Sequence, residues 1–196
     1  MSLTFRTLRG VALEEALDDV ARLRLTVFRE FPYLYHGDAA YERRYLSSYR
    51  DNPDAIVVAA YDGDQLVGAS TGTPLAQHDR AFVQPVEGAG FVPAEVFYCA
   101  ESVLLKPYRG QGAGHVFFDR RKAHARALGA TWSVFCAVER EADHPARPEN
   151  YIPLEPFWTR RGYKPLPGVS ANFEWRELGQ AVETAHKLGF WCKKLT

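Results

Sequence analysis

Hydrophobic residues in the first quarter of the chain change from the alternation of a strand to the repeat of helices. Residues 3–8 alternate well enough to predict a first strand. Between residues 13 and 28 the apolar side chains recur on one helical face. A second helix is predicted over residues 38–49, where Asp38 can serve as the N-cap. The chain is therefore expected to open with one strand and two helices.

The middle of the chain contains two further kinds of pattern. Residues 55–61 and 65–71 are separated by an Asp-Gly turn and predict a β-hairpin. Residues 74–93 contain several prolines and glycines and little periodicity, which predicts a long surface excursion. Residues 96–105 are apolar, aromatic and β-branched, as in a largely buried strand. Pro107 then prevents the ladder from continuing without a break.

The last third of the chain is rich in strand patterns. A polar loop is predicted over residues 139–151, followed by a short helix over 154–161 that Gly162 ends. A polar segment, residues 180–187, separates the last two strand candidates. The strand candidates of this part are residues 132–138, 173–178 and 190–195. Because helices and strands alternate early and strands dominate late, we expect a mixed α/β sheet.

Composition narrows the class of protein. With 196 residues, 46% of them hydrophobic, the chain is expected to form a single domain over residues 1–196. The 24 basic and 24 acidic residues balance, which favours neither a nucleic acid nor an anionic membrane as partner. No apolar segment could span a bilayer, and the first ten residues lack a signal-peptide core. Three cysteines without metal-ligand spacing indicate a cytoplasmic location.

A glycine turn, residues 109–114, follows the strand of residues 96–105. Its sequence is Arg-Gly-Gln-Gly-Ala-Gly, and a helix is predicted directly after it. The residues that recur there at helical spacing are Val116, Phe117, Arg120, Ala123, Ala127 and Leu128. The first N–H groups of a helix lack internal partners, and glycines let a ligand approach them, so the unit can bind phosphate. The alternative is a turn that only packs the helix on the sheet.

Two common phosphate-binding motifs do not fit this turn. A Walker loop requires Gly-Lys-Ser/Thr after its spacer, and this sequence is absent. The dinucleotide fingerprint requires a third glycine at the position that His115 occupies. A nucleotide-binding domain is therefore the weaker interpretation.

The sequence of the turn, Arg109-Gly110-Gln111-Gly112-Ala113-Gly114, resembles the Arg/Gln-x-x-Gly-x-Gly/Ala signature of the GNAT superfamily of N-acetyltransferases. Residues 101–105 are similar to the fourth strand of that family, and residues 157–163 to its late Phe-Tyr-x-x-x-Gly-Phe segment. The early Phe-Pro-Tyr-Leu-Tyr and late Pro-Phe-Trp-x-Arg-Arg-Gly-Tyr resemble a bacterial subgroup without a secure substrate. The resemblance implies a mixed, mostly antiparallel sheet of about six to seven strands, flanked by about four helices.

The resemblance also implies acetyl-CoA as co-substrate and a set of residues that bind it. In the GNAT fold the fourth strand parts from the fifth, and the pantetheine arm pairs with the exposed strand edge. The residues that the resemblance assigns to this cofactor are Val103, Leu104, Leu105, Arg109, Gly110, Gln111, Gly112, Ala113, Gly114 and Phe157. For Arg109 the alternative is a surface arginine that caps the turn.

Glu101 is the candidate general base. It is the only acid in an otherwise apolar strand, where burial of a charge is costly unless the charge is paired or functional. In many GNAT enzymes a glutamate near this strand position deprotonates the acceptor amine. The alternative is a structural glutamate that pairs with an arginine.

An aromatic loop, residues 31–37, separates the first two predicted helices. The resemblance places this region near the acceptor, so Tyr33, Tyr35 and Tyr41 are candidates for a substrate wall. The alternative is a plug that closes the edge of the core. The acceptor class is a small-molecule or peptide amine, and its identity stays open, as do acyl-chain preference and a homodimer.

One residue departs from the resemblance. Trp158 stands where many GNAT enzymes have a tyrosine that protonates the leaving thiolate, and indole cannot do so. Tyr151, Tyr163 or solvent could replace it. Cys136 is expected to be a packing residue, and the histidines show no metal-ligand spacing, so no metal site is expected. The sequence thus predicts direct acetyl transfer in a ternary complex; the alternative is a non-catalytic acyl-CoA sensor or interaction module.

Overall fold

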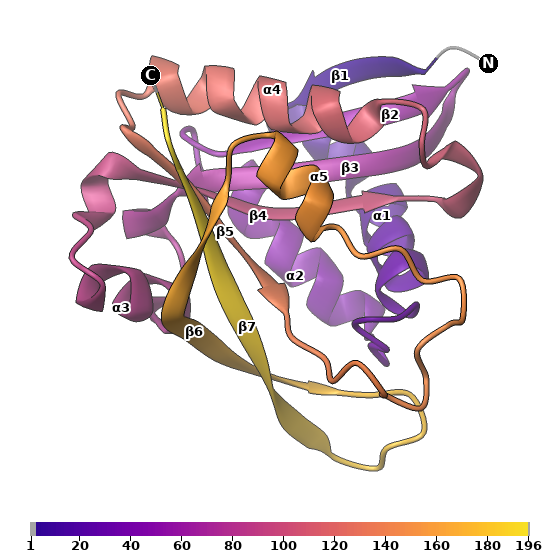
Figure 1. Ribbon diagram of the computed structural model, residues 1–196. Coiled ribbons are helices and arrows are strands. Elements are labelled where there is room, and N and C mark those ends of the chain that lie inside the picture. Colours follow the sequence, from indigo (N-terminus) through magenta and orange to yellow (C-terminus); the bar gives the residue numbers. More distant parts are fainter. Residues whose placement is uncertain (1–2, 196) are drawn as a thin grey trace.

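A seven-stranded sheet forms the centre of the protein in the computed structural model, which describes residues 3–195 (Figure 1). The strand order is β1-β2-β3-β4-β5-β7-β6, and every neighbouring pair is antiparallel except β4 and β5. The strands are β1 (Thr4–Leu8), β2 (Ile56–Asp62), β3 (Gln65–Pro74), β4 (Val96–Leu104), β5 (Trp132–Val138), β6 (Lys164–Arg176) and β7 (Glu183–Lys194). The predicted mixed, mostly antiparallel sheet is confirmed.

Helices cover both faces of this sheet. In Figure 1, α1 and α2 lie behind the sheet, whereas α4 and α5 lie on its other side. The helices are α1 (Gly10–Phe28), α2 (Ala39–Arg50), α3 (Arg80–Gly88), α4 (Ala113–Ala127) and α5 (Glu155–Arg160), with short 3-10 turns at Leu75–Gln77, Pro93–Glu95 and Lys106–Tyr108. The predicted N-cap of α2 is confirmed, because Asp38 Oδ1 accepts a hydrogen bond of 2.7 Å from the Tyr41 N–H.

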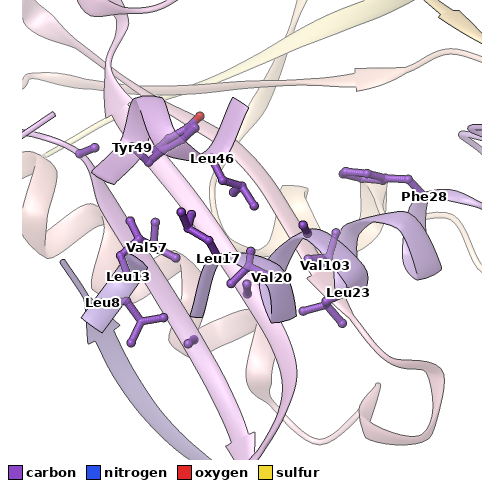
Figure 2. Packing of buried hydrophobic residues seen from close by; sticks show 14 residues of the cluster. Leu8, Leu13, Leu17, Val20, Leu23, Phe28, Leu46, Tyr49, Val57 and Val103 are labelled. Carbon is purple, nitrogen blue, oxygen red and sulfur yellow. The ribbon is translucent and has the colours of Figure 1, made fainter. Parts of the chain in front are cut away.

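The first core cluster fills the space between α1, α2 and the sheet (Figure 2). The helical spacing of apolar residues that predicted α1 is also the spacing of the side chains that α1 buries. The labelled members of the cluster are Leu8, Leu13, Leu17, Val20, Leu23, Phe28, Leu46, Tyr49, Val57 and Val103. Full burial of such a side chain contributes about 1.5–3 kcal/mol, so this interface holds both helices on the sheet.

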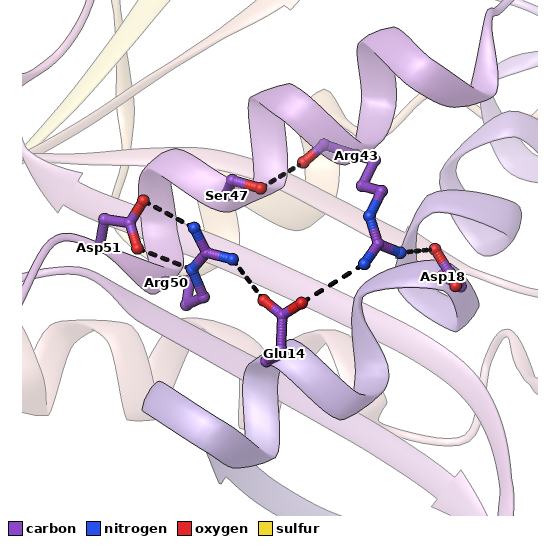
Figure 3. Close-up of polar contacts among 6 residues, drawn as sticks. All are labelled: Glu14, Asp18, Arg43, Ser47, Arg50 and Asp51. Atoms are coloured by element: carbon purple, nitrogen blue, oxygen red, sulfur yellow. Dashed lines mark hydrogen bonds and ion pairs between the residues drawn. The ribbon is translucent and has the colours of Figure 1, made fainter.

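A network of surface ion pairs fixes the position of α2 along α1 (Figure 3). Glu14 lies between Arg43 and Arg50 and pairs with both. Arg43 also pairs with Asp18, and Arg50 with Asp51. Exposed pairs contribute roughly 0–1 kcal/mol each, so the network orients the two helices more than it stabilises them.

The helix predicted after the glycine turn is α4. Of the residues whose helical spacing predicted it, Phe117 is buried, whereas Ala123, Ala127 and Leu128 are exposed. The buried residues of α4 are Ala113, Phe117, Phe118, Arg121 and Ala125. The buried face of α4 thus includes an arginine, a residue type that is rarely buried and that a sequence pattern assigns to the surface.

Residues 74–93 also differ from the prediction, because they contain α3 and the 3-10 turn Leu75–Gln77. Asp79 Oδ1 accepts from the Ala81 N–H and caps the helix, and Phe82 and Val86 are buried one turn apart. Pro85 lies inside the helix near its end, where it removes one N–H donor. The predicted surface excursion was wrong because a proline that would break a long helix is tolerated near the end of this nine-residue helix.

The last two strands extend beyond their predicted bounds. Residues 183–187, predicted as part of a polar separator, belong to β7 and pair with β6, for example Glu174 with Ala185. Polar residues are allowed there because the two long strands stabilise each other by backbone pairing and expose one face. The register slips between the pairs Pro165–Trp191 and Ser170–Gly189, so a bulge forms in β6.

His78 lies beside β4 and is held in its neutral form. Its ring centroid lies 4.7 Å from that of Tyr98 and 5.2 Å from that of Phe82. Burial lowers the pKa of His78 to about 4, from an ordinary value of 6.5, although nearby Asp79 opposes the shift. The unfolded chain therefore binds a proton below about pH 6.5 that the native state does not take up until about pH 4.

We expect the free energy of unfolding to fall between pH 6.5 and 4 partly through His78. Relative to His78→Phe, the wild-type protein should lose up to about 1.4 kcal/mol more per pH unit in this window. Urea unfolding at several pH values measures both proteins. Parallel curves would show that His78 is not held neutral in the native state.

Candidate active site

Strands β4 and β5 pair over a short distance and then separate. The three parallel pairs join Val96 to Trp132, Phe97 to Ser133 and Tyr98 to Val134. Beyond them, among the residues that the structure describes, β4 pairs with β3 alone and β5 with β7 alone. Figure 1 shows the two strands diverging, with α5 beside the gap between their ribbons. This opening leaves one backbone edge of β4 without a strand partner, which confirms the expected parting.

A β-bulge lies in β4 where the opening begins. Thr71 of β3 is opposite Glu101, whereas Thr73 is opposite Tyr98. Two residues of β4 therefore face the single residue Gly72 of β3. A Cβ on Gly72 would lie 2.5 Å from the Phe97 ring, so only glycine fits beside the bulge.

The bulge decides which face of the sheet receives Glu101. Ala100 packs with residues on the α1 face, and strict alternation would send Glu101 to the α4 face. Instead, Glu101 contacts Arg24 of α1, and the next residue, Ser102, contacts Arg121 of α4. Two consecutive side chains thus point to the α1 face, as the extra residue requires.

Glu101 belongs to a buried cluster of charges. Its side chain is 10% exposed and forms an ion pair with Arg24, and its Oε1 accepts a hydrogen bond of 3.1 Å from Thr71. Arg24 also pairs with Glu42, which is fully buried. One guanidinium therefore serves two carboxylates. Glu101 therefore has the arginine partner that the structural alternative expects.

The glycine turn presents free N–H groups at the start of α4. Gly110 and Gly112 have φ values of +77° and +87°, which favour glycine. No side chain caps α4, and within residues 3–195 no acceptor is found for the backbone N–H groups of residues 110–114. The Gln111 side chain instead donates to the Pro107 carbonyl. These groups and the helix dipole favour an anion at this position.

Phe157 lies against the same turn from α5. A Cβ on Gly114 would lie 3.2 Å from the Phe157 ring, so the ring covers the first residues of α4 closely. Its ring centroid is also 5.1 Å from that of His115. The structure therefore brings Phe157 together with the glycine turn, as the assignment of both to one cofactor requires.

Arg109 connects the glycine turn to the end of α1. Its two terminal nitrogens donate to both carboxylate oxygens of Glu30, at 2.8 and 3.0 Å. Its Nε donates to the Leu104 carbonyl at 2.9 Å. The guanidinium thus ties together the turn, β4 and the residue before the aromatic loop. In the sequence, nothing distinguished Glu30 as this partner.

The three residues of the predicted cofactor edge lie beside the opening. Val103 is buried toward α1, and Leu104 packs in the cluster under α4. The Leu105 N–H donates to Val67 of β3 at 2.9 Å. Because β3 occupies one side of this segment, its other backbone edge faces the opening.

The aromatic loop is anchored to the end of β6. Tyr35 forms a bridge with Glu177, and the Pro32 carbonyl accepts a hydrogen bond of 2.7 Å from Arg140. The Tyr33 ring lies 4.6 Å from that of Phe28 and packs into the interior. The position of Tyr33 is thus that of a plug at the edge of the core.

Tyr35 and Tyr41, by contrast, lie near the buried Glu42. Burial and, secondly, the Glu42 carboxylate raise the pKa of both tyrosines. Tyr41 is 37% exposed and Tyr35 is half-buried. Two of the three predicted wall residues therefore lie near Glu42 of the charge cluster.

Cys136 lacks the properties of a nucleophile. It is buried on β5, and the Tyr98 hydroxyl lies 3.0 Å from its sulfur. Burial raises the pKa of the Cys136 thiol to about 12, so it stays protonated near neutral pH.

Trp158 packs in an apolar cluster on the α5 side. Its ring centroid lies 4.9 Å from that of Phe135 and 5.2 Å from that of Trp191. Tyr163 is buried nearby, its hydroxyl lies 2.7 Å from Ser133, and burial raises its pKa. Ser133 belongs to the paired part of β5, so Tyr163 is held away from the opening.

A pocket of about 310 Å³ lies on the α5 side of β5, next to the β6 bulge. Trp158 and Trp191 contribute to its wall, but none of its lining residues belongs to β4. The pocket therefore lies beside the opening rather than in it. Over residues 3–195, no group of three or more His, Cys, Asp and Glu residues could hold a metal ion. In the same range, no helix is long and apolar enough to cross a membrane.

Sequence reasoning missed three charged residues of this region: Arg24, Glu42 and Arg121. Arg24 and Glu42 lie on helices that also carry many exposed charges, so composition alone does not separate them. A signal was present for Arg24, because it directly follows Leu23 of the buried stripe in α1.

Comparisons with known proteins agree with this geometry. The model of the acetyltransferase (GNAT) family matches residues 18–148, from α1 to the loop after β5. Among solved structures, YncA from Salmonella typhimurium, which contains its cofactor acetyl-CoA, has a TM-score of 0.64 at 11% identity and covers 100% of this chain and 95% of its own. A search of curated proteins found no significant match.

Two further structures show the same fold. An aminoglycoside 6'-N-acetyltransferase complexed with coenzyme A has a TM-score of 0.60 at 18% identity, over 100% of this chain and 98% of its own. A ribosomal-protein-alanine N-acetyltransferase from Brucella melitensis has a TM-score of 0.62 at 14% identity, over 98% and 99%. The chain belongs to the GNAT family of acetyltransferases, and it is therefore an acyltransferase.

Proposed function

We propose that this acetyltransferase moves an acetyl group from acetyl-CoA to a primary amine while both substrates are bound. The observation that carries the proposal is the opening between β4 and β5, with Glu101 turned to one face and the glycine turn on the other. A screen of amines with acetyl-CoA, read by thiol release, tests it. Absence of release with every amine, together with tight acetyl-CoA binding, would contradict it.

The donor side of the site fits acetyl-CoA, which supplies an acetyl group activated as a thioester. The free N–H groups of residues 110–114 and the α4 dipole suit a pyrophosphate. The unpaired edge of residues 103–105 suits the amide groups of a pantetheine arm. Phe157 closes the turn from the α5 side. Positioning of the two substrates can account for about 7–11 kcal/mol of the barrier.

Glu101 serves as the general base on the acceptor side. An ammonium cannot attack until it loses a proton, and the ionised Glu101 carboxylate can accept it directly or through water. The amine nitrogen then bonds to the acetyl carbon as the bond from that carbon to sulfur breaks, and the thiolate takes up a proton from solvent. Arg24 stays paired with Glu42 throughout and keeps the protonated Glu101 in place.

Tyr35 and Tyr41 form the exposed wall of the acceptor site in this proposal. Tyr35 belongs to the aromatic loop and Tyr41 to the first turn of α2, and both rings lie near Glu42. They can orient a polar acceptor, whereas Tyr33 supports the loop from inside the core.

A non-catalytic acyl-CoA sensor is the second candidate. It is favoured by the ion pair between Glu101 and Arg24 and by Trp158, which cannot protonate a thiolate. The two candidates differ in turnover rather than in binding. Calorimetric binding of acetyl-CoA measured beside the thiol-release screen therefore separates them.

Gly112→Val should weaken acetyl-CoA binding by about tenfold or more, because a side chain there would block the pyrophosphate. Gly129→Val is the matched control, since Gly129 follows the other end of α4 with a φ of +79°. Neither added Cβ meets an atom within 4 Å, so both variants carry a similar backbone strain. Calorimetry should show weakened binding for Gly112→Val alone; equal affinities would contradict the assignment of the turn.

Tyr35→Phe should raise the acceptor KM by roughly two- to tenfold, the usual cost of one lost hydrogen bond. The KM for acetyl-CoA should stay within about twofold, because the ring and the loop are kept. Tyr61→Phe is the control, since it removes a hydroxyl from β2. Steady-state kinetics measure both variants. A Tyr35→Phe enzyme with an unchanged acceptor KM would show that the wall does not contact the acceptor.

Glu101→Gln should lower kcat/KM by about 100-fold at neutral pH and leave acetyl-CoA affinity unchanged. The variant should fold, because Arg24 keeps Glu42 as its ionic partner. A higher pH should restore part of the rate, since solvent then deprotonates the amine. Kinetics across a pH range and circular dichroism measure these effects.

The matched control for this variant is Glu42→Gln, which removes the other carboxylate from the same arginine. It should cost stability but change turnover by less than about tenfold. If both variants lose stability alike and neither loses turnover, Glu101 is a structural ion-pair partner.

A further inference from the structure

Arg121 of α4 is 1% exposed, although it carries a full charge and no ion pair with it is found in the described part of the chain. A buried guanidinium is costly unless its donors are satisfied. Here the acceptors are mainly backbone carbonyls, and the Phe118 ring lies 4.8 Å from its central carbon. Arg121 is therefore stabilised by hydrogen bonds to these acceptors rather than by an ion pair with a carboxylate.

These hydrogen bonds meet at the β4 bulge. One terminal nitrogen of Arg121 donates to the Glu101 carbonyl at 2.9 Å and to the Thr71 carbonyl at 3.2 Å. The other donates to the Ser102 hydroxyl at 2.9 Å. Thr71 and Glu101 are the residue pair at which the ladder resumes after the bulge. A single guanidinium thus holds both strands where the register changes.

The contacts also act on the orientation of Glu101. Its carbonyl is held from the α4 face by Arg121, and its carboxylate is held from the α1 face by Arg24. A bulge disrupts the ladder and leaves backbone groups in need of other partners. Without a donor from α4, the alternative register would remove the bulge and turn Glu101 to the α4 face.

We propose that Arg121 is a positioning residue, which holds the β4 bulge so that Glu101 faces the acceptor side. This role rests on the proposed function of Glu101 as the base. Arg121 touches neither substrate and acts through the backbone of Glu101. It also makes α4, the helix that begins at the glycine turn, the support for the base on the opposite face of the sheet.

A double-mutant cycle between Arg121→Lys and Glu101→Gln tests this role. Lysine keeps the charge, but its single nitrogen cannot reproduce the planar fork that spans the two carbonyls and Ser102. In the wild-type background, Arg121→Lys should lower kcat by about tenfold or more, since small misplacements of a reacting group are costly. In the Glu101→Gln background it should lower kcat by less than about twofold, because the base that it positions is already absent.

Calorimetric affinity for acetyl-CoA supplies a readout besides turnover, and Arg121→Lys should leave it within about threefold. Ser102→Ala is the matched control, because it removes the hydroxyl acceptor of the same guanidinium without touching the bulge carbonyls. It should change kcat by less than about twofold. Equal losses from Arg121→Lys in both backgrounds would overturn the positioning role while leaving the base assignment intact.

Full activity of Glu101→Gln would overturn the base assignment and the positioning role together. If Arg121→Lys is recovered unfolded, Arg121→Gln, a planar neutral donor, enters the same cycle. Failure of both variants to fold would show that Arg121 supports the whole sheet rather than the bulge, and would overturn the proposal.

Discussion

The extra residue in β4 is the feature on which the site depends. A strand that kept strict alternation would place Glu101 beneath α4, on the same face as the glycine turn. The bulge moves the carboxylate to the α1 face while the strand continues to pair with β3. Gly72 makes room for this distortion on the neighbouring strand. Donor and acceptor groups can thereby lie on opposite faces and meet at the opening.

Buried charges hold this arrangement from both faces. Arg24 reaches β4 from α1, and Arg121 reaches it from α4. Desolvation of such groups can exceed the Coulombic gain, so they contribute little net stability compared with an apolar core of the same volume. Their effect is on geometry, since each guanidinium has directional donors that accept few alternative strand positions. The surface ion pairs in Figure 3 orient α2, and with it Glu42, along α1.

The sequence predicted most elements because their burial follows a simple period. The stripe of α1, the Asp38 cap and the β4 strand all satisfy local rules that tertiary contacts reinforce. The glycine turn was predictable because its sequence matches the signature of one family. The phase of α4 was not, since Arg121 behaves as a core residue only where carbonyls of two strands lie within its reach. The strand ends of β6 and β7 depend on mutual pairing that neither segment shows alone.

The bulge itself explains why the candidate base could be named but not oriented. An acid in an apolar strand is visible in one sequence, whereas the face it points to depends on a one-residue change of register against β3. That change is encoded in residues far apart in the chain, namely Gly72 on β3 and Arg121 on α4. Both act through packing and hydrogen bonds of the folded sheet. The orientation of this candidate base is therefore a tertiary property, while the acid itself is visible in the local sequence.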